Sequence, residues 1–405
     1  MRRLIFGLAC SGLLAAALWL VACSSDEQVL APAALARAVL GGTDAAPASV
    51  GGPLAGAAAR APLAGLPSVD DEPAPANPLE SSVARAWQLA RRGRGTEADA
   101  LLEAVLGQAP QYRPALTLSG LLHAEWSQPV ADAEDERPPA RQLQPPAVLS
   151  DESSVRLAAW QHQALHRRLL PGNLLQLGRQ VDTVLAADLA ESRLYVLRRD
   201  GHGLSLRADY YLSTGTRGSF KQIPGDQRTP IGVYSLLSRL PASQLPPLAG
   251  HGAWPLSFPN RWDQWQGHLG SGIWLHGSPP GQYDGLPHST NGCLALSNDD
   301  LDQLSPLLAG AGTVLLVADH LDWITPAALA QRRSSAIQRL LAHGGHARKP
   351  AEADSLYAYP GDPSLLLVRR AEGAVGARDE FWPSGAMEPL AALHGGGGGH
   401  RGSAP

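Results

Sequence analysis

The chain has 405 residues, of which 44% are hydrophobic and 17% are charged, so it carries enough apolar side chains to bury a core. Its formal net charge is −4, and its Lys and Arg residues form no basic stripe. This balance excludes the electrostatic surface on which nucleic-acid-binding proteins depend, and no nucleic-acid partner is expected. The length allows one catalytic domain with appended segments.

The first 22 residues have the pattern of a signal peptide. Arg2 and Arg3 precede an apolar run over residues 4–22, and Cys23 follows small residues at its end. The end of the run resembles a bacterial lipobox, which implies that Cys23 becomes a lipidated N-terminus. Ser24 then favours the outer membrane of a Gram-negative cell, with the protein facing the periplasm. An ordinary cleaved signal and an uncleaved membrane anchor are the alternatives.

Cysteine usage points to one reactive thiol. Of the three cysteines, Cys10 lies in the predicted signal peptide and Cys23 lies at its end, which leaves Cys293 as the lone thiol of the mature chain. A single cysteine in an exported protein, with a histidine upstream in a Gly-rich setting, is typical of a nucleophile. An inert buried thiol is the alternative.

The residues before the cysteine region predict a tether followed by helices. Residues 23–80 are rich in Ala, Pro and Gly and predict a disordered linker. Helical spacing over residues 81–175 predicts three helices up to residue 124 and a fourth that starts at Ser153 or Ser154 and ends at Leu170. The segment resembles one tetratricopeptide unit and the start of another. Partner binding and simple packing are both open as its role.

Residues 181–318 predict a mostly β domain. Short β-like runs cover 181–186, 193–198, 204–212, 232–237, 272–276 and 313–318. Ser297 is the predicted cap of a single short helix over 298–308. Beyond this domain, residues 319–393 predict a helix over 326–343 and a hairpin of 355–359 with 365–370, without a functional signal. The Gly-rich tail, 394–405, is expected to be disordered.

The chemistry of a cysteine nucleophile requires a base and an oxyanion site. His276 ends a predicted strand and is the leading base, with the backbone carbonyl of Gly277 or Ser278 fixing its tautomer. The N–H groups of Gly292 and Cys293 are the expected oxyanion donors. A zinc site from His268, His276, His288 and Cys293 lacks a tight pair of ligands, so neither a metal nor a cofactor is expected.

Three ordered sequence blocks resemble the YkuD-type L,D-transpeptidases of bacterial peptidoglycan. The first runs from Ser213 to Gly215 and continues with the Thr-Pro-Ile-Gly-Val-Tyr run at 229–234. The second is His276-Gly277, and the third is the Thr-Asn-Gly-Cys-Leu run at 290–294 with its continuation to Leu301. The resemblance covers about residues 181–318. It implies a mostly β YkuD-like sandwich with one short helix, preceded by the α-helical segment.

The resemblance also implies an activity. Cys293 would attack the stem tetrapeptide of peptidoglycan, release D-alanine as a thioester forms, and pass the acyl group to an amine. The chain has Asn291 where many members have a histidine, a role open to His288, and Ala295 where many have Arg or Asn. Arg217, Lys221, Arg228 and Arg261 are the candidates to hold the substrate carboxylate instead, and Arg228 is the favoured one by position. Thr290 and Asn291 are expected to contact the substrate. A hydrolase that uses water is one alternative, and a non-catalytic scaffold that recruits wall enzymes through its helices is another.

Overall fold

The computed structural model describes residues 77–126, 151–201, 203–308, 313–343, 347–372 and 376–383. The predicted signal peptide, the lipidated Cys23, the linker up to residue 76 and the tail from residue 394 lie outside these ranges. Within them, no helix combines the length and the apolar character needed to cross a bilayer.

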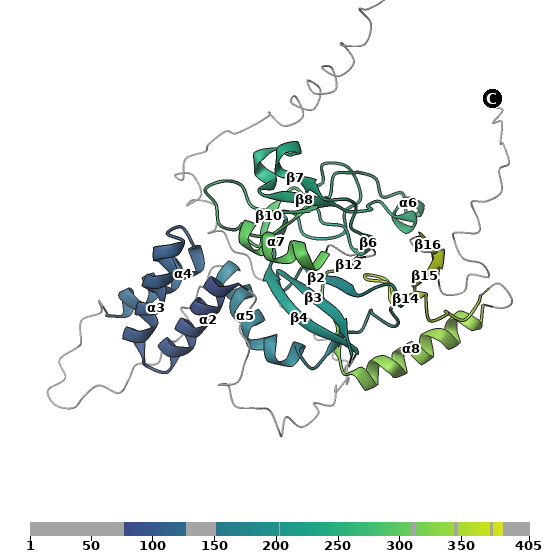
Figure 1. The fold of residues 1–405 in the computed structure, drawn as a ribbon, viewed down its shortest axis with the longest axis horizontal. Helices are drawn as coiled ribbons and strands as arrows, with labels where there is room; N and C mark the ends of the chain where they lie inside the picture. Colours follow the sequence, from purple (N-terminus) through teal and green to yellow (C-terminus); the bar gives the residue numbers. More distant parts are fainter. Residues whose placement is uncertain are drawn as a thin grey trace, which may run out of the picture. The chain divides into compact units, whose positions relative to one another are not determined.

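The described chain begins with four helices (Figure 1). They are α2 (Pro78–Arg91), α3 (Gly95–Gln108), α4 (Arg113–Trp126) and α5 (Asp151–His166). The helix α2 starts inside the predicted linker because the Asn77 side chain accepts the N–H groups of Leu79 and Glu80 and Pro78 suits the first turn. The predicted start and end of the fourth helix were wrong. The helix already includes Asp151, and it stops at His166, before residue 170.

The helices α2, α3 and α4 pack on one another through a core of their own. Its buried members include Val83, Ala86, Leu102, Val105 and Leu118. Leu157 and Trp160 of α5 pack against this core from the side. The helical segment therefore buries its apolar faces partly within itself and partly against α5, which leads into the β domain.

Two sheets form the β domain. The first has the strand order β4 (Gly203–Tyr211), β3 (Arg193–Asp200), β2 (Thr183–Asp188), β12 (Val314–Ala318) and β6 (Gly232–Ser235). The second has the order β11 (Leu294–Ala295), β9 (Trp274–His276), β8 (Gly252–Pro255) and β7 (Leu240–Pro241). Apolar side chains from both sheets share one core, among them Leu185, Val196, Leu275, Leu294 and Leu315. Helices followed by a β-rich domain confirm the predicted fold class.

Smaller elements complete this domain. The strands β5 (Thr214–Gly215) and β10 (His288–Thr290) form a parallel pair. The helix α7 (Asn298–Leu304) follows the cysteine, and the Ser297 side chain caps it as predicted. It continues as the 3-10 turn η4 (Ser305–Leu308). The short helix α6 (Arg261–Trp265) was not predicted, and neither were the 3-10 turns η2 (Ala242–Gln244) and η3 (Pro247–Ala249).

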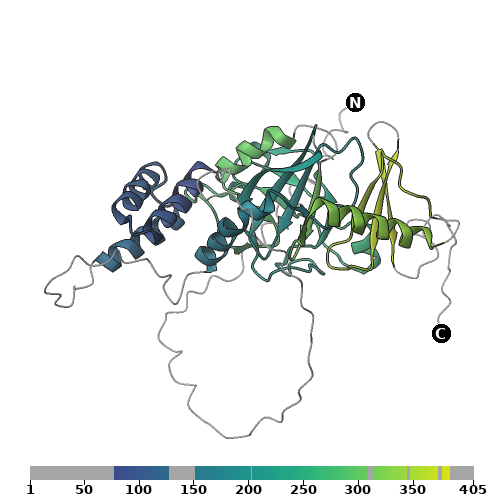
Figure 2. The ribbon, with the colours of Figure 1, turned by 90° about the horizontal axis from the view of Figure 1, so that it is seen from below.

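The C-terminal segment covers the other face of the first sheet. It contains β13 (Trp323–Ile324), which pairs with β1 (Leu170–Pro171), the helix α8 (Pro326–Leu341), and a sheet of β14 (Ser355–Ala358), β15 (Leu366–Glu372) and β16 (Gly376–Trp382). Figure 2 shows α8 running beside these strands, and Leu329, Ala336 and Leu340 share a core with them. Tyr357, Leu367 and Phe381 join the core that includes Val184 and Leu316. With apolar partners on both faces, β2 and β12 are buried along their whole length.

Candidate active site around Cys293

Strand pairing places Cys293 and His276 on one face of the second sheet. The strands β11 and β9 are parallel, with Leu294 opposite Leu275 and Ala295 opposite His276. Leu294 and Leu275 are fully buried in the core. Because side chains alternate along extended backbone, Cys293 and His276 both lie on the opposite face. Cys293 and His276, which are 17 positions apart in sequence, are thus brought together by the pairing of β11 with β9.

The imidazole of His276 has a fixed tautomer. Its Nδ1 lies 2.6 Å from the Gly277 carbonyl oxygen, as predicted. A carbonyl oxygen only accepts, so Nδ1 carries the hydrogen and Nε2 is left as the basic nitrogen. Burial lowers the pKa of His276, while the bond to Gly277 acts against this shift. The ring is therefore a neutral base at neutral pH.

Glycine at position 277 is required by packing. A Cβ there would collide with the Oδ1 atom of Asn298. Asn298 accepts the His251 N–H at 2.9 Å and donates to the Ser278 carbonyl at 2.9 Å. Asn298, the first residue of α7, thereby links the backbone at Ser278, next to Gly277, to the backbone of His251. The family resemblance includes Asn298 in the run to Leu301, but no role for its side chain was predicted.

The Cys293 thiol is surrounded by backbone. Its Sγ donates to the Gly272 carbonyl oxygen at 3.5 Å. Burial raises the pKa of the thiol, while the backbone N–H of Trp274 and the charge of Lys221 lower it. Burial is the largest of these effects, so the thiol is neutral at neutral pH.

Lys221, one of the candidate cations for the substrate carboxylate, is a charged neighbour of Cys293. Its buried ammonium donates to Asp226 Oδ1 at 2.7 Å and to the Ile223 carbonyl at 3.1 Å. Burial raises the pKa of Asp226, but Lys221 and backbone N–H groups overcome this and hold it at about 2. The pair ties together the loop that leads to Thr229 and places a cation near Cys293.

The cysteine loop, which we define as Asn291, Gly292 and Cys293 between β10 and β11, contacts Thr290 and the backbone of Arg228. Gly292 has φ of 110°, and a Cβ there would lie 2.5 Å from the Arg228 carbonyl oxygen. Thr290 Oγ1 accepts the Gly292 N–H at 3.1 Å and donates to the Cys293 carbonyl at 2.7 Å. The Gly292 N–H already donates its hydrogen bond to Thr290 Oγ1, so it is not free for the predicted role as an oxyanion donor. The Cys293 N–H has no hydrogen-bond partner within the described ranges and stays available for an oxyanion.

The other predicted site residues lie around this loop with contacts of their own. Arg228 is exposed, and its guanidinium donates to the Ser219 carbonyl at 2.9 Å. Asn291 is exposed, with its Oδ1 3.5 Å from Gln227 Nε2. His288 Nδ1 lies 3.0 Å from Thr214 Oγ1 across the β5–β10 pair.

Two of the histidines that the sequence analysis weighed as zinc ligands lie on different elements. His268 follows α6, with its Nδ1 3.8 Å from Asp263 Oδ1, whereas His288 belongs to β10.

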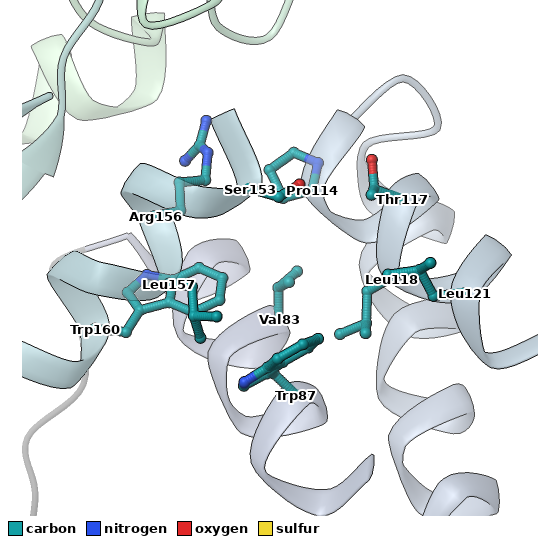
Figure 3. Close-up of a pocket in the computed structure, with 10 residues that line it drawn as sticks. All are labelled: Val83, Trp87, Pro114, Thr117, Leu118, Leu121, Ser153, Arg156, Leu157 and Trp160. Carbon is teal, nitrogen blue, oxygen red and sulfur yellow. The ribbon is translucent and has the colours of Figure 1, made fainter. Parts of the chain in front are cut away.

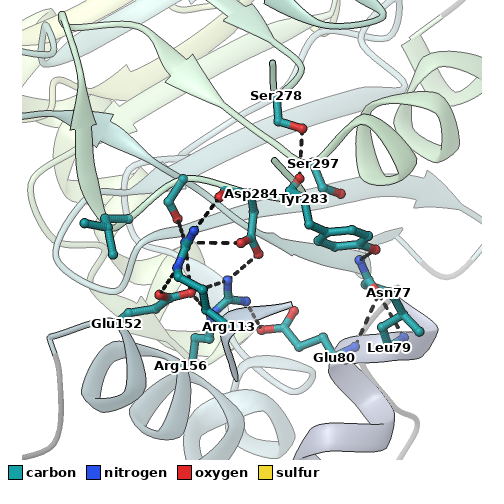
Figure 4. A network of polar contacts seen from close by, with 12 residues as sticks. Asn77, Leu79, Glu80, Arg113, Glu152, Arg156, Ser278, Tyr283, Asp284 and Ser297 are labelled. Carbon is teal, nitrogen blue, oxygen red and sulfur yellow. Dashed lines mark hydrogen bonds and ion pairs between the residues drawn. The ribbon is translucent and has the colours of Figure 1, made fainter. Parts of the chain in front are cut away.

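A buried ionic network joins the helices to the loop between His276 and Cys293 (Figure 4). Asp284, in that loop, accepts from Arg156 of α5 and from Arg113 of α4. Arg113 also donates to the carbonyls of Asp284 (2.9 Å) and Gly285 (2.6 Å). Arg156 in turn binds Glu80 and Glu152. The loop that leads from the base toward the nucleophile is thus held by side chains of the helical segment.

The same helices reach α7. Asn77 donates to Asp300 Oδ1 at 2.9 Å and to the Tyr283 hydroxyl at 3.0 Å. Glu80 takes two hydrogen bonds from Arg193 of β3, at 2.8 and 2.9 Å. The first residues of α2 therefore contact three separate parts of the β domain. No sequence motif signalled these contacts.

Two concave sites lie away from the cysteine. One is an apolar pocket among α2, α4 and α5, with Trp87, Leu118 and Trp160 in its wall (Figure 3). The other is polar and lies between the start of α2, the α3–α4 connection and α7, with Asp299 and Asp302 on its rim. Neither contains Cys293 or His276.

Comparison with known proteins identifies the β domain. Residues 182–317 match the family model of the YkuD L,D-transpeptidase catalytic domain. The chain therefore carries a β-rich YkuD domain after its N-terminal helices. No curated protein matches the chain.

Solved structures give weaker similarities. Bd1075 of Bdellovibrio bacteriovorus is 21% identical, with 53% of this chain and 98% of that one covered and a TM-score of 0.39. The helical cell shape determining protein Pgp2 of Campylobacter jejuni is 17% identical, with 52% and 89% covered and a TM-score of 0.39.

Proposed function

We propose that this protein is a peptidoglycan L,D-transpeptidase in which Cys293 is the nucleophile and His276 the general base. The observation that carries the proposal is the placement of both side chains on one face of the β9–β11 pair, with Nδ1 of His276 fixed by Gly277. The match of residues 182–317 to the YkuD catalytic domain supplies the substrate class, which is the stem peptide of peptidoglycan.

The reaction begins with proton transfer. Nε2 of His276 takes the Cys293 proton as sulfur attacks the carbonyl carbon before the terminal D-alanine of the stem. The Cys293 N–H stabilises the oxyanion, and the imidazolium then gives its proton to the departing D-alanine amine. A thioester remains on Cys293. An acceptor amine attacks it after losing a proton to His276, and the thiol is regenerated with a new amide bond.

The molecule that accepts the acyl group from the thioester determines the product: three amine acceptors give transfer products, and water gives the alternative, hydrolysis. An amine of a second stem gives a 3→3 crosslink, an amine of a protein gives an attached protein, and a free D-amino acid gives exchange. Water gives hydrolysis instead. Arg228 is exposed next to the cysteine loop, so it is the cation that we assign to the substrate carboxylate.

Mass spectrometry of muropeptides tests the proposal. Purified protein is incubated with disaccharide tetrapeptides, and we expect loss of D-alanine together with a new amide-linked product. The variants Cys293→Ala and His276→Gln should abolish or strongly reduce turnover, whereas His251→Ala, an exposed histidine on Asp302, should not change it. Unchanged substrate with the wild-type protein would refute the enzymatic proposal, and free tripeptide as the main product would favour the hydrolase.

We also propose that the chain is exported and anchored through a lipid on Cys23, facing the periplasm, as the N-terminal pattern predicts. Metabolic labelling with a palmitate analogue tests this proposal. Label is expected on the wild-type chain and not on Cys23→Ala.

The scaffold alternative is favoured by one observation, the apolar pocket among α2, α4 and α5. If the Cys293→Ser variant restored full growth and wall composition in a deletion strain, the scaffold role would replace catalysis.

A further inference from the structure

A cluster of metal-ligating side chains lies outside the cysteine site. His162 and His166 belong to α5, and Glu191 lies in the turn between β2 and β3. One ligand atom from each of the three lies within 4.8 Å of the others. Within the described parts of the chain, this is the only such group of three or more His, Cys, Asp or Glu residues.

We propose that His162, His166 and Glu191 bind a divalent transition-metal cation, with Zn²⁺ as the best fit. Two imidazoles and one carboxylate form a ligand set that Zn²⁺ uses, with water or another ligand in the fourth position. Residues four apart on a helix lie on the same face, so α5 presents both imidazoles to Glu191 together. The site would join α5 to the first sheet.

Glu191 is held as a metal-binding carboxylate is held. The Tyr195 hydroxyl donates to Glu191 Oε2, and the Glu191 N–H donates to Asp188 Oδ1 at 3.0 Å. The other carboxylate oxygen, Oε1, faces His162 Nδ1 at 3.0 Å. An outer hydrogen bond that orients one oxygen while the other faces the ligands is a usual feature of metal sites.

His166 gives the second, independent observation. The residue is 5% exposed, and its Nδ1 is buried without a hydrogen-bond partner. Its ring stacks on Trp323 with centroids 4.2 Å apart and meets Tyr195 edge-on. A buried ring nitrogen without a partner is costly, and a coordinated cation would satisfy it.

Further titratable side chains surround the cluster. His320 and Asp188 also face the cluster, 3.4 Å from each other.

A simple ion pair of His162 with Glu191 explains less. It accounts for the 3.0 Å contact but leaves the buried Nδ1 of His166 unsatisfied. Ligand atoms on a tetrahedral zinc ion lie about 3.4 Å apart, given zinc–ligand distances of about 2.0–2.1 Å. The three ligand atoms here lie within 4.8 Å of one another. Because the His162 side chain is 48% exposed, its ring is free to move and bring them to the spacing of a zinc site.

Zinc titration of the full-length protein tests the site. The protein is prepared with an affinity tag that contains no histidine, in a Cys293→Ala background that removes the thiol, and Zn²⁺ is titrated against a fluorescent zinc indicator. We expect the titration to saturate at one equivalent of Zn²⁺ per chain, as for a single site with three protein ligands. His162→Ala and Glu191→Gln should each weaken binding at least tenfold. His251→Ala, another exposed histidine paired with a carboxylate, should leave it unchanged.

Thermal unfolding supplies a second readout. Zn²⁺ should raise the Tm of the parent and of His251→Ala and should not raise that of His162→Ala, because only a ligand that binds the native state stabilises it. Binding that does not saturate at one equivalent would overturn the proposal. Equal affinity in the parent and in both ligand variants would overturn it as well. Because His162 is half exposed, its replacement is expected to fold, and the test does not depend on changing the buried His166.

Discussion

Replacing Arg156 with methionine is the sharpest test of the ionic network between the helices and the β domain. Arg156 is 1% exposed and donates four hydrogen bonds, two to Glu152, one to Glu80 and one to Asp284. Its guanidinium also lies 3.4 Å from the ring centroid of Tyr211. Methionine has a similar volume and no charge, so the variant leaves three buried carboxylates with fewer cations.

The expected loss is large. Removing one partner from a buried ion pair costs about 3–5 kcal/mol. With an unfolding entropy of about 2.1 cal/mol/K per residue, 1 kcal/mol corresponds to about 1.8 °C for the roughly 270 described residues, so Tm should fall by at least about 5 °C. Arg179→Met is the matched control. Its ion pair with Glu352 is exposed, with 73% and 79% of the two side chains accessible, so its loss should cost under about 1 kcal/mol.

The pH dependence gives a further check on the same variant. Burial raises the pKa of Glu80, but Arg193 and Arg156 overcome this and hold it at about 2. A depressed carboxyl pKa contributes stability that is fully present above its ordinary value, about 4.3, and lost as pH falls through about 2. The stability gap between wild type and Arg156→Met should therefore be widest above pH 5 and narrow below pH 4. Denaturant unfolding measured across this range would refute the reasoning if the gap stayed under 1 kcal/mol or did not change with pH.

Three further predictions concern substitutions of single residues. Burial raises the pKa of Asp300 to about 7, so the stability that its protonated form contributes is full below pH 4 and lost as pH rises through 7. Asp300→Asn should thus be more stable than wild type at pH 8, by up to about 4 kcal/mol, and the gain should vanish at pH 4. Gly292→Ala should cost about 1–3 kcal/mol and slow acylation of Cys293 by a carbapenem, whereas Gly267→Ala, also at positive φ but with open space around its Cβ, should leave acylation unchanged. Because burial lowers the pKa of His276, the acid limb of Cys293 alkylation should have its midpoint below about 6.5, and His276→Gln should remove that limb. A midpoint at or above 6.5 would contradict the buried, neutral imidazole.

Much of the fold could be predicted because local signals and the tertiary structure agree. The runs at 193–198 and 204–212 are bounded by turn residues, and they form the β3–β4 hairpin. Ser297 before Asp299 and Asp300 marks a helix start, and α7 begins there. By contrast, β16 has the sequence Gly-Ala-Arg-Asp-Glu-Phe-Trp and no apolar alternation over its first five residues, so its strand state depends on pairing with β15.

The candidate site was only partly predictable for a related reason. A motif identifies Cys293 and His276 because their chemistry needs fixed neighbours in sequence. Lys221 and Asn298 act through contacts that only the fold creates, and Asp284 meets Arg156 across 128 positions. The His162-x3-His166 spacing is visible on the predicted fourth helix, but no local pattern links it to Glu191. The use of the Gly292 N–H by Thr290 depends on loop geometry that the Thr-x-Gly-Cys pattern does not specify.

The network also changes how a scaffold role for the helices must be tested. Deleting residues 81–124 would remove Arg113, which holds Asp284 and the Gly285 carbonyl, so the loop next to the cysteine would lose its support even if the helices bound no partner. Loss of function in such a deletion would be expected under either role. Substitutions on exposed positions, such as Leu116→Asp, leave these contacts in place because Leu116 is 47% exposed. If Leu116→Asp keeps full muropeptide turnover in vitro and loses activity in cells, the helices bind a partner. If Leu116→Asp keeps both turnover in vitro and activity in cells, the surface at Leu116 binds no essential partner. If Arg113→Met then loses turnover, the helices serve to hold the loop at Asp284 and Gly285.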